Sequence, residues 1–221
     1  MIVLVHHVLC ASSRALRLQL SEKGIAFELR AERPWERRPE FLRLNPAGEL
    51  PLLVEDEGVV AGAMAALEFV EETHSDPPLL GRDARQRAEV RRLLHWFLAK
   101  FEAEVTIPVV GEKVIKRING GGPPNSRAIS AGRQNIHMHL DYIAWLMDRR
   151  RWLSGESMTL ADIVAAAQLS VLDYAGEVPW VKHPEAKDWY ARIKSRPTFR
   201  PLLADVIPGI PPPKHYTDLD F

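Results

Sequence analysis

Hydrophobic and polar positions follow two different patterns along the chain, and the change lies near residue 75. Before it, a short apolar run at residues 2–5 and the segment 26–30 predict strands, and an amphipathic repeat over residues 14–23 predicts a helix between them. A strand, a helix and a strand in this order predict a parallel pair with a right-handed crossover.

The next segment adds a second pair of strands to this sheet. Residues 50–55 and 59–61 flank Asp56-Glu57-Gly58, a sequence typical of a hairpin turn. A helix is predicted over residues 63–73. Together these segments predict a small mixed α/β sheet with helices packed on it.

After residue 75 the pattern is helical only, so the chain is expected to have two domains. Residues 75–78, Ser-Asp-Pro-Pro, are typical of a linker, and Gly and Pro make residues 119–125 a loop. Helices are predicted over residues 83–104, 129–150, 159–175 and 185–195. The expected boundaries are 1–75 for the sheet domain, 76–82 for the linker, 83–206 for the helical domain and 207–221 for a Pro-rich acidic tail.

Composition excludes several classes of function. The 221 residues carry 29 basic and 29 acidic side chains, so no overall basic field indicates a nucleic-acid partner. A single cysteine excludes an internal disulfide framework, and the adjacent His6 and His7 point to opposite faces of a strand, so no metal site is expected. No apolar run reaches the roughly 20 residues needed for membrane insertion, and we expect a cytoplasmic protein.

Three motifs resemble those of glutathione S-transferases. Residues 45–53, Asn-Pro-Ala-Gly-Glu-Leu-Pro-Leu-Leu, resemble the family segment in which the second proline, here Pro51, is cis beside glutathione. Residues 159–163 resemble the buried capping box of the family, and Thr159 and Asp162 are spaced to form such a box. Residues 189–197 resemble the closing helix. The resemblance covers residues 1–203 and implies a thioredoxin-like N-terminal domain followed by an all-helical C-terminal domain.

The glutathione site implied by this resemblance is degenerate. The family holds the γ-glutamyl end with a Glu or Gln followed by Ser, and those positions here are Gly62 and Ala63. Leu50 and Pro51 complete the implied site. Each hydrogen bond to a charged group contributes about 1.5–3 kcal/mol, so losing both weakens glutathione by roughly a hundred- to ten-thousandfold. The helix N-terminus still offers backbone N–H groups to an anion.

The first helix carries the other half of the implied site. Residues 9–14, Leu-Cys-Ala-Ser-Ser-Arg, resemble the start of the helix in cysteine-type members, with Ala11 in place of proline. A helix N-terminus lowers the pKa of a thiol, so Cys10 is a candidate for a mixed disulfide with glutathione, or else a small buried residue. Ser12 is the alternative thiolate-stabilising group, although we expect at least one of Ser12 and Ser13 to cap the helix. Without such an activity no cofactor is expected.

Two segments have the composition of protein-binding surfaces. Trp35 lies among arginines that include Arg37 and Arg38, and Trp and Arg are frequent interface anchors. The tail combines a stiff Pro-rich spacer with acidic and apolar residues, as in a docking peptide, or it packs on its own domain. Its candidate docking residues are Tyr216, Asp218, Leu219, Asp220 and Phe221. Residues 111–118 add a basic stretch that suits an acidic partner or a solvated helix face.

The tail and the degenerate site together resemble the glutathione S-transferase-like division proteins of alphaproteobacteria. This resemblance implies a homodimer that binds FtsZ or another protein polymer, acts without catalysis and lies at the division site. A dimer presents each binding surface twice, which raises avidity for a polymer. The alternative is a glutathione S-transferase or glutathione-dependent thiol reductase that uses Cys10 or Ser12.

Overall fold

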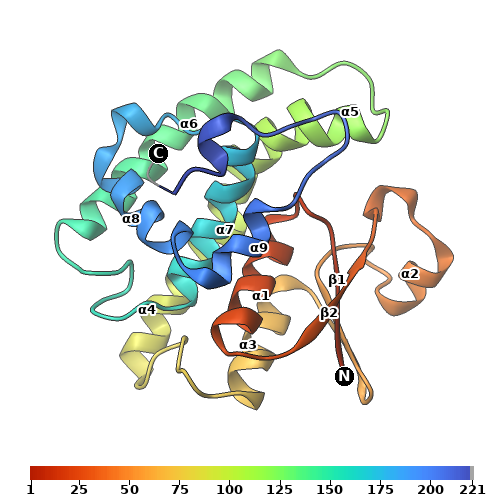
Figure 1. Ribbon diagram of the computed structural model, residues 1–221, viewed down its shortest axis with the longest axis horizontal. Helices are drawn as coiled ribbons and strands as arrows, with labels where there is room; N and C mark the ends of the chain where they lie inside the picture. The colour runs from red at the N-terminus through yellow and green to blue at the C-terminus, as the bar shows by residue number, and fades with distance from the viewer. Residues whose placement is uncertain (220–221) are drawn as a thin grey trace.

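A four-stranded mixed sheet forms the first part of the protein, whose computed structural model describes residues 1–219 (Figure 1). The strand order is β2-β1-β3-β4, in which β1 pairs in parallel with β2 and antiparallel with β3, and β3 pairs antiparallel with β4. The strands are β1 (Ile2–His6), β2 (Phe27–Ala31), β3 (Leu52–Glu55) and β4 (Gly58–Ala61). The predicted parallel pair and hairpin are confirmed.

Alternating apolar side chains cover the two faces of this sheet. Leu4 and Leu53 are fully buried in the main core, whereas Val5 and Leu52 join a smaller cluster around Phe41. Phe41 belongs to a short helix, α2 (Pro39–Leu44), which follows the turn η1 (Pro34–Glu36). Neighbouring residues of a strand point to opposite faces, so each face of the sheet needs its own cover.

Helices α1 (Ala11–Glu22) and α3 (Ala63–Thr73) pack with the sheet. The bounds predicted for α3 are confirmed, but α1 begins three residues before the predicted start at Arg14. Its first ten residues are all buried, because α1 also packs against the helical part of the protein through α7 (Leu160–Tyr174).

The segment between α3 and the helical part is packed rather than free. Leu79 and Leu80 are buried, and the Glu71 carboxylate accepts hydrogen bonds from both of their backbone N–H groups at 3.0 and 3.2 Å. Lys23 forms an ion pair with Glu71 at 2.9 Å. The bond between Leu50 and Pro51 is cis, as predicted, and the bond between Asp76 and Pro77 is also cis.

The second part is built from helices around α7, every residue of which is buried. The predicted capping box is confirmed: Asp162 accepts from the Thr159 backbone N–H at 2.9 Å, and the reciprocal bond is also present. The other helical elements are α4 (Ala84–His95), η2 (Trp96–Ile115), α5 (Lys116–Ile118), α6 (Ser126–Met147), η3 (Trp180–Lys182), α8 (Pro184–Lys194), η4 (Pro197–Phe199), α9 (Arg200–Leu203) and η5 (Lys214–Tyr216).

The predicted end of the first long helix at Glu104 is wrong. The chain continues from α4 through η2, a π-helix that contains Pro108, and ends only after α5. Phe97, Phe101 and Val105 of η2 are fully buried, and η2 packs against both α6 and α7. Packing against α6 and α7 therefore outweighs the local helix-breaking tendency of proline.

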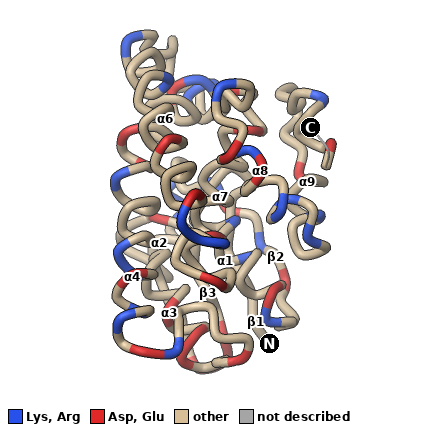
Figure 2. Tube along the Cα trace, turned by 90° about the vertical axis from the view of Figure 1, so that its left-hand side faces the viewer, with Lys and Arg blue, Asp and Glu red and all other residues tan. Residues whose placement is uncertain are grey.

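Basic and acidic residues are interspersed over both parts of the protein (Figure 2). This arrangement agrees with the zero formal net charge of the sequence. Among the described residues, no helix has the length and apolar character needed to cross a membrane.

Candidate functional site

A cavity of about 520 Å³ lies between the sheet part and the helices η2 and α3. The structure brings most of the predicted site residues together here: Cys10, Ser12, Leu50, Gly62 and Ala63. Among the described residues, the lining is His7, Leu9, Cys10, Ser12, Pro34, Trp35, Gly48, Glu49, Leu50, Gly62, Ala63, Leu98, Glu102 and Ile115.

Cys10 caps the first turn of α1. Its Sγ accepts a hydrogen bond from the backbone N–H of Ser13 at 3.4 Å and lies 3.9 Å from the carbonyl oxygen of Leu50. The expectation of a lowered thiol pKa is wrong: burial raises the pKa of Cys10, and the Glu102 carboxylate raises it further, against the hydrogen bonds from the helix start. The helix dipole is therefore outweighed by desolvation.

Ser12 and Ser13 lie in different environments. Ser12 is buried and lines the cavity, whereas the Ser13 Oγ is fully enclosed and has no hydrogen-bond partner among the described residues. The side-chain cap of α1 is Cys10, so the expectation that a serine caps this helix is wrong.

Gly62 and Ala63 leave the start of α3 without a binding side chain. Gly62 caps α3 with a φ of 92° and makes no side-chain hydrogen bond, while its backbone N–H donates to the carbonyl of Pro51 at 3.2 Å. Outside Gly62 and its chain neighbours, no described atom lies within 4 Å of the position that a Cβ would take at Gly62, although the positive φ strains any side chain there. Gly62 and Ala63 carry neither the hydroxyl nor the carboxyl or amide group that the family resemblance implies at these positions.

Two carboxyl groups that no sequence motif marks, those of Glu49 and Glu102, line this cavity. Burial raises the pKa of Glu102, and nearby Glu49 raises it further, although Gln168 donates a hydrogen bond to Glu102 at 3.2 Å. Burial, aided by Arg14, lowers the pKa of His7 to about 4, so this imidazole is neutral at pH 7. The cavity lining therefore combines two carboxyl groups with a neutral imidazole and, among the described residues, has no lysine or arginine.

Trp35 forms part of the cavity wall. It lies in η1, is half-buried and meets the His7 ring edge-on, with 5.0 Å between ring centroids. Arg37 and Arg38 are exposed, and Arg38 forms an ion pair with Glu32 at 2.5 Å. Trp35 thus packs against His7 and also lines the cavity. Its role in protein binding stays a prediction.

The tail packs onto its own protein through Tyr216. This side chain is fully buried, and its hydroxyl accepts from Arg14 Nη1 at 2.9 Å and donates to the Leu202 carbonyl at 3.0 Å. The interpretation of Tyr216 as a docking residue is therefore corrected, because it belongs to the core. Asp218 is exposed and Leu219 half-buried, whereas Asp220 and Phe221 lie outside the described residues.

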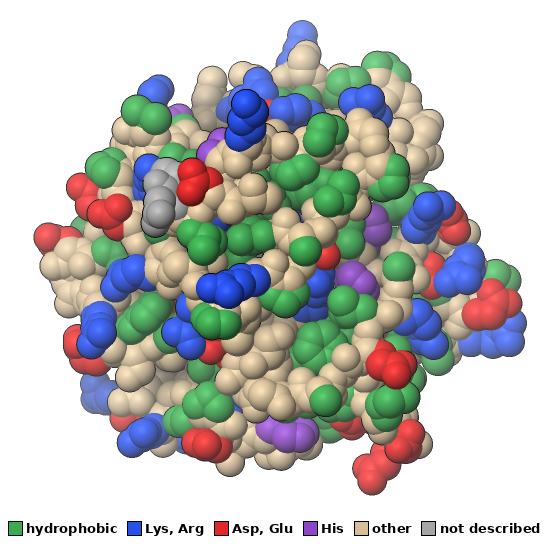
Figure 3. Space-filling view, in the orientation of Figure 1, with side chains coloured by type: hydrophobic (Ala, Val, Ile, Leu, Met, Phe, Trp, Pro, Cys, Tyr) green, Lys and Arg blue, Asp and Glu red, His purple; other side chains and the backbone are tan. Residues whose placement is uncertain are grey.

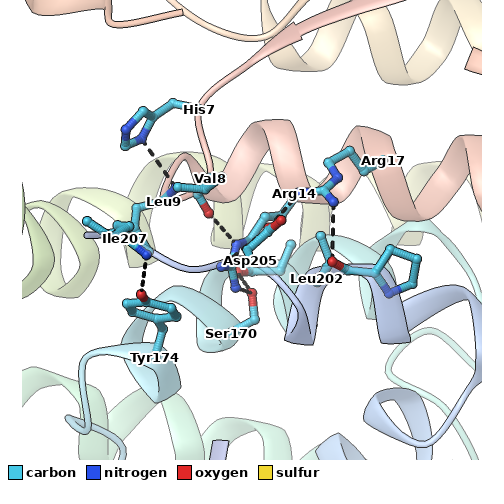
Figure 4. Close-up of polar contacts among 12 residues, drawn as sticks. His7, Val8, Leu9, Arg14, Arg17, Ser170, Tyr174, Leu202, Asp205 and Ile207 are labelled. Carbon is cyan, nitrogen blue, oxygen red and sulfur yellow. Dashed lines mark hydrogen bonds and ion pairs between the residues drawn. The ribbon is translucent and has the colours of Figure 1, made fainter. Parts of the chain in front are cut away.

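Arg14 connects this tail to the segment that precedes α1, and Figure 4 shows Arg14 beside Val8 and Ser170. Its guanidinium donates to the carbonyl of Val8 at 2.6 Å and to the Ser170 hydroxyl at 2.9 Å, in addition to the Tyr216 hydroxyl. The Asp205 carboxylate lies 3.8 Å away. A buried charge needs such partners. The sequence showed Arg14 only as part of an amphipathic helix, since all of these contacts come from distant segments.

Known proteins give a consistent assignment. Residues 9–73 match the family model of the glutathione S-transferase N-terminal domain, and residues 126–192 match that of the C-terminal domain. FtsZ-localized protein A of Caulobacter vibrioides is 50% identical over 220 residues, covering 98% of this chain and 96% of that protein.

Solved structures agree with these matches. A structure described as a glutathione S-transferase from Rhodospirillum rubrum is 54% identical, with a TM-score of 0.98 and full coverage of both chains. FzlA from C. crescentus is 49% identical, with a TM-score of 0.96 over 100% of this chain and 99% of that one. The chain therefore belongs to the glutathione S-transferase family.

Proposed function

We propose that this protein associates with FtsZ polymers at the division site and acts there without glutathione chemistry. The observation that carries the proposal is the 50% identity, over nearly the full chain, to a Caulobacter protein named for its localisation with FtsZ. Identity at this level extends over both domains rather than over one shared motif.

The cavity supports the non-catalytic part of the proposal. Glutathione has two carboxylates and one ammonium group, and the cavity presents Glu49 and Glu102 to it. Gly62 and Ala63 supply no side-chain hydrogen bond in compensation. Burial of Cys10 raises its thiol pKa, which disfavours the thiolate that a redox reaction requires.

The proposed mechanism is bridging by a homodimer. A two-fold dimer presents the Trp35 loop and the exposed Asp218 of the tail twice. Neighbouring subunits of a polymer then hold both copies at once, so the apparent affinity for a polymer exceeds that for one subunit. Sedimentation of the purified protein measures the dimer directly.

Pelleting with Caulobacter FtsZ tests the association. The protein is expected to sediment with FtsZ assembled in GTP and to stay in the supernatant with FtsZ in GDP. Trp35→Ala is expected to reduce the pelleted fraction. Trp145→Ala is the matched control, because Trp145 is a half-exposed tryptophan on α6 that does not line the cavity.

The outcomes separate the parts of the proposal. Absence of pelleting with folded, dimeric protein contradicts FtsZ association. Equal loss in the two tryptophan variants contradicts a specific role of the Trp35 loop. A calorimetric titration with millimolar reduced glutathione addresses the cavity, and saturable binding there contradicts the degenerate-site argument.

The second candidate is a glutathione S-transferase or thiol reductase with glutathione as cofactor. It is favoured by the position of Cys10 and Ser12 in the cavity, beside the cis bond at Pro51. A thiol-transfer assay on a mixed disulfide, together with an electrophile-conjugation assay, tests it. Loss of activity in Cys10→Ala supports a cysteine mechanism, and loss in Ser12→Ala alone supports a serine mechanism.

A further inference from the structure

A second surface of the protein differs from the cavity in both charge and shape. Residues 206–213 leave α9 and run past the end of η2 and α5, where they line two adjoining hollows of about 350 and 430 Å³. Both hollows are lined by Arg117, Gly209 and Ile210, so they form one groove, which we call the tail groove. Hydrophobic side chains gather on this face of the molecule (Figure 3).

The floor of the tail groove is aliphatic. Val8, Ile118 and Ile210 are half-buried, and Val206 has 65% of its surface exposed. Prolines at positions 208 and 211–213 fix the backbone along the groove, which reduces the entropy lost when an extended segment binds. An exposed aliphatic strip of this kind suits branched or linear apolar side chains of a partner.

The rim of the tail groove is basic. Arg33 and Arg117 line the first hollow and Lys113 lines the second, and no aspartate or glutamate lines either one among the described residues. Lys113 is neutralised by Glu177 at 2.5 Å, and Arg33 forms an exposed ion pair with Glu36 at 3.1 Å. The Arg117 side chain is exposed and forms no hydrogen bond or ion pair with any residue from 1 to 219.

We propose that the tail groove binds a short acidic segment of a partner protein, in which carboxylates alternate with aliphatic side chains. The carboxylates pair with Arg117 and Arg33, and the aliphatic side chains cover the strip around Val206 and Ile210. Arginine is suited to this role because its planar guanidinium pairs with a carboxylate through two parallel hydrogen bonds.

The neighbouring cavity determines where along the surface an acidic segment can bind. His7 lines both the cavity and the tail groove, so the two sites meet at its ring. The cavity carries Glu49 and Glu102, which repel an acidic segment, whereas the groove attracts it. The acidic segment is thereby directed along residues 206–213 and away from the cavity.

Fluorescence anisotropy with a short labelled peptide of alternating Asp or Glu and Leu or Val residues tests the proposal. A peptide with Lys at every acidic position is the comparison. We expect saturable binding of the acidic peptide only, with an affinity that falls as salt is raised. Arg117→Glu should weaken binding about tenfold or more, and Val206→Ser about threefold.

Arg85→Glu is the matched control for Arg117→Glu. Arg85 is an exposed arginine in the first turn of α4, and it lines neither hollow. Circular dichroism confirms that each variant is folded. Equal binding of the acidic and basic peptides, or an equal effect of the two arginine variants, overturns the proposal. Self-association that Arg117→Glu abolishes and the acidic peptide does not displace also overturns it, because the occupant is then a second copy of this chain.

Discussion

Removing residues 214–221 is expected to destabilise the whole protein far more than removing only residues 218–221. The difference lies in Tyr216, which is fully buried and bonded to Arg14 and Leu202. The longer deletion also removes the His215 carbonyl that accepts from Lys194 at 2.9 Å.

The size of the effect follows from these contacts. Truncating a buried aromatic side chain costs about 3–5 kcal/mol. A chain of this length loses about 2–4 °C in Tm for each kcal/mol, so the longer deletion should lower Tm by roughly 6–20 °C. Tyr216→Phe keeps the ring and removes only the hydroxyl, and it should cost about 1.5–3 kcal/mol because Arg14 loses a partner.

Thermal and urea unfolding followed by circular dichroism at the helical band measure both deletions and Tyr216→Phe. Two deletions that unfold at the same temperature would refute the argument that Tyr216 anchors the tail. The result also governs the FtsZ assay: loss of pelleting after the longer deletion reports unfolding, whereas loss after removal of residues 218–221 reports the exposed tail itself.

The remaining predictions concern the cavity and the first strand. Ala63→Ser restores one hydroxyl at the start of α3 and should strengthen glutathione binding about tenfold or more in calorimetry; an unchanged affinity would show that charge, not the missing hydroxyl, limits binding. Burial, aided by Arg17, lowers the pKa of His6 to about 4 from its ordinary 6.5. His6 in the unfolded chain therefore binds a proton at a higher pH than His6 in the folded protein. The free energy of unfolding should fall as pH drops from about 6.5 to 4, and His6 should contribute up to about 3 kcal/mol of this loss. His6→Gln should flatten this part of the urea-unfolding pH profile, and an unaltered slope would contradict the assignment.

The fold was predictable because several independent local signals agree. The strands and the helix over residues 63–73 follow from apolar periodicity, and the capping box at Thr159 follows from side-chain spacing alone. The degenerate pair at Gly62 and Ala63 was found in the same way, by register within a motif. Signals of this kind are local, so they do not depend on what the segment later packs against.

Four expectations were wrong, three of them because distant segments decided the outcome. Packing of η2 on α6 and α7 carries the helix past Pro108. Burial and Glu102 outweigh the helix dipole at Cys10 and raise its thiol pKa. Cys10, not Ser12 or Ser13, supplies the side-chain cap of α1. Tyr216 is held in the core by Arg14, although its flanking residues resemble a docking peptide.

The sequence by itself determined how the main strands and helices follow one another along the chain, and it contains the family motifs. It also determined that Gly62 and Ala63 stand at the two positions where the family resemblance implies glutathione-binding side chains. These features depend on residue type and spacing within short stretches. Only the tertiary structure decided the charged residues of the cavity lining, the place of the tail and the position of Arg117 beside the tail groove. Burial and long-range electrostatics depend on which distant side chains meet, and Arg14, Glu102 and Arg117 acquire their environments only when the chain is folded.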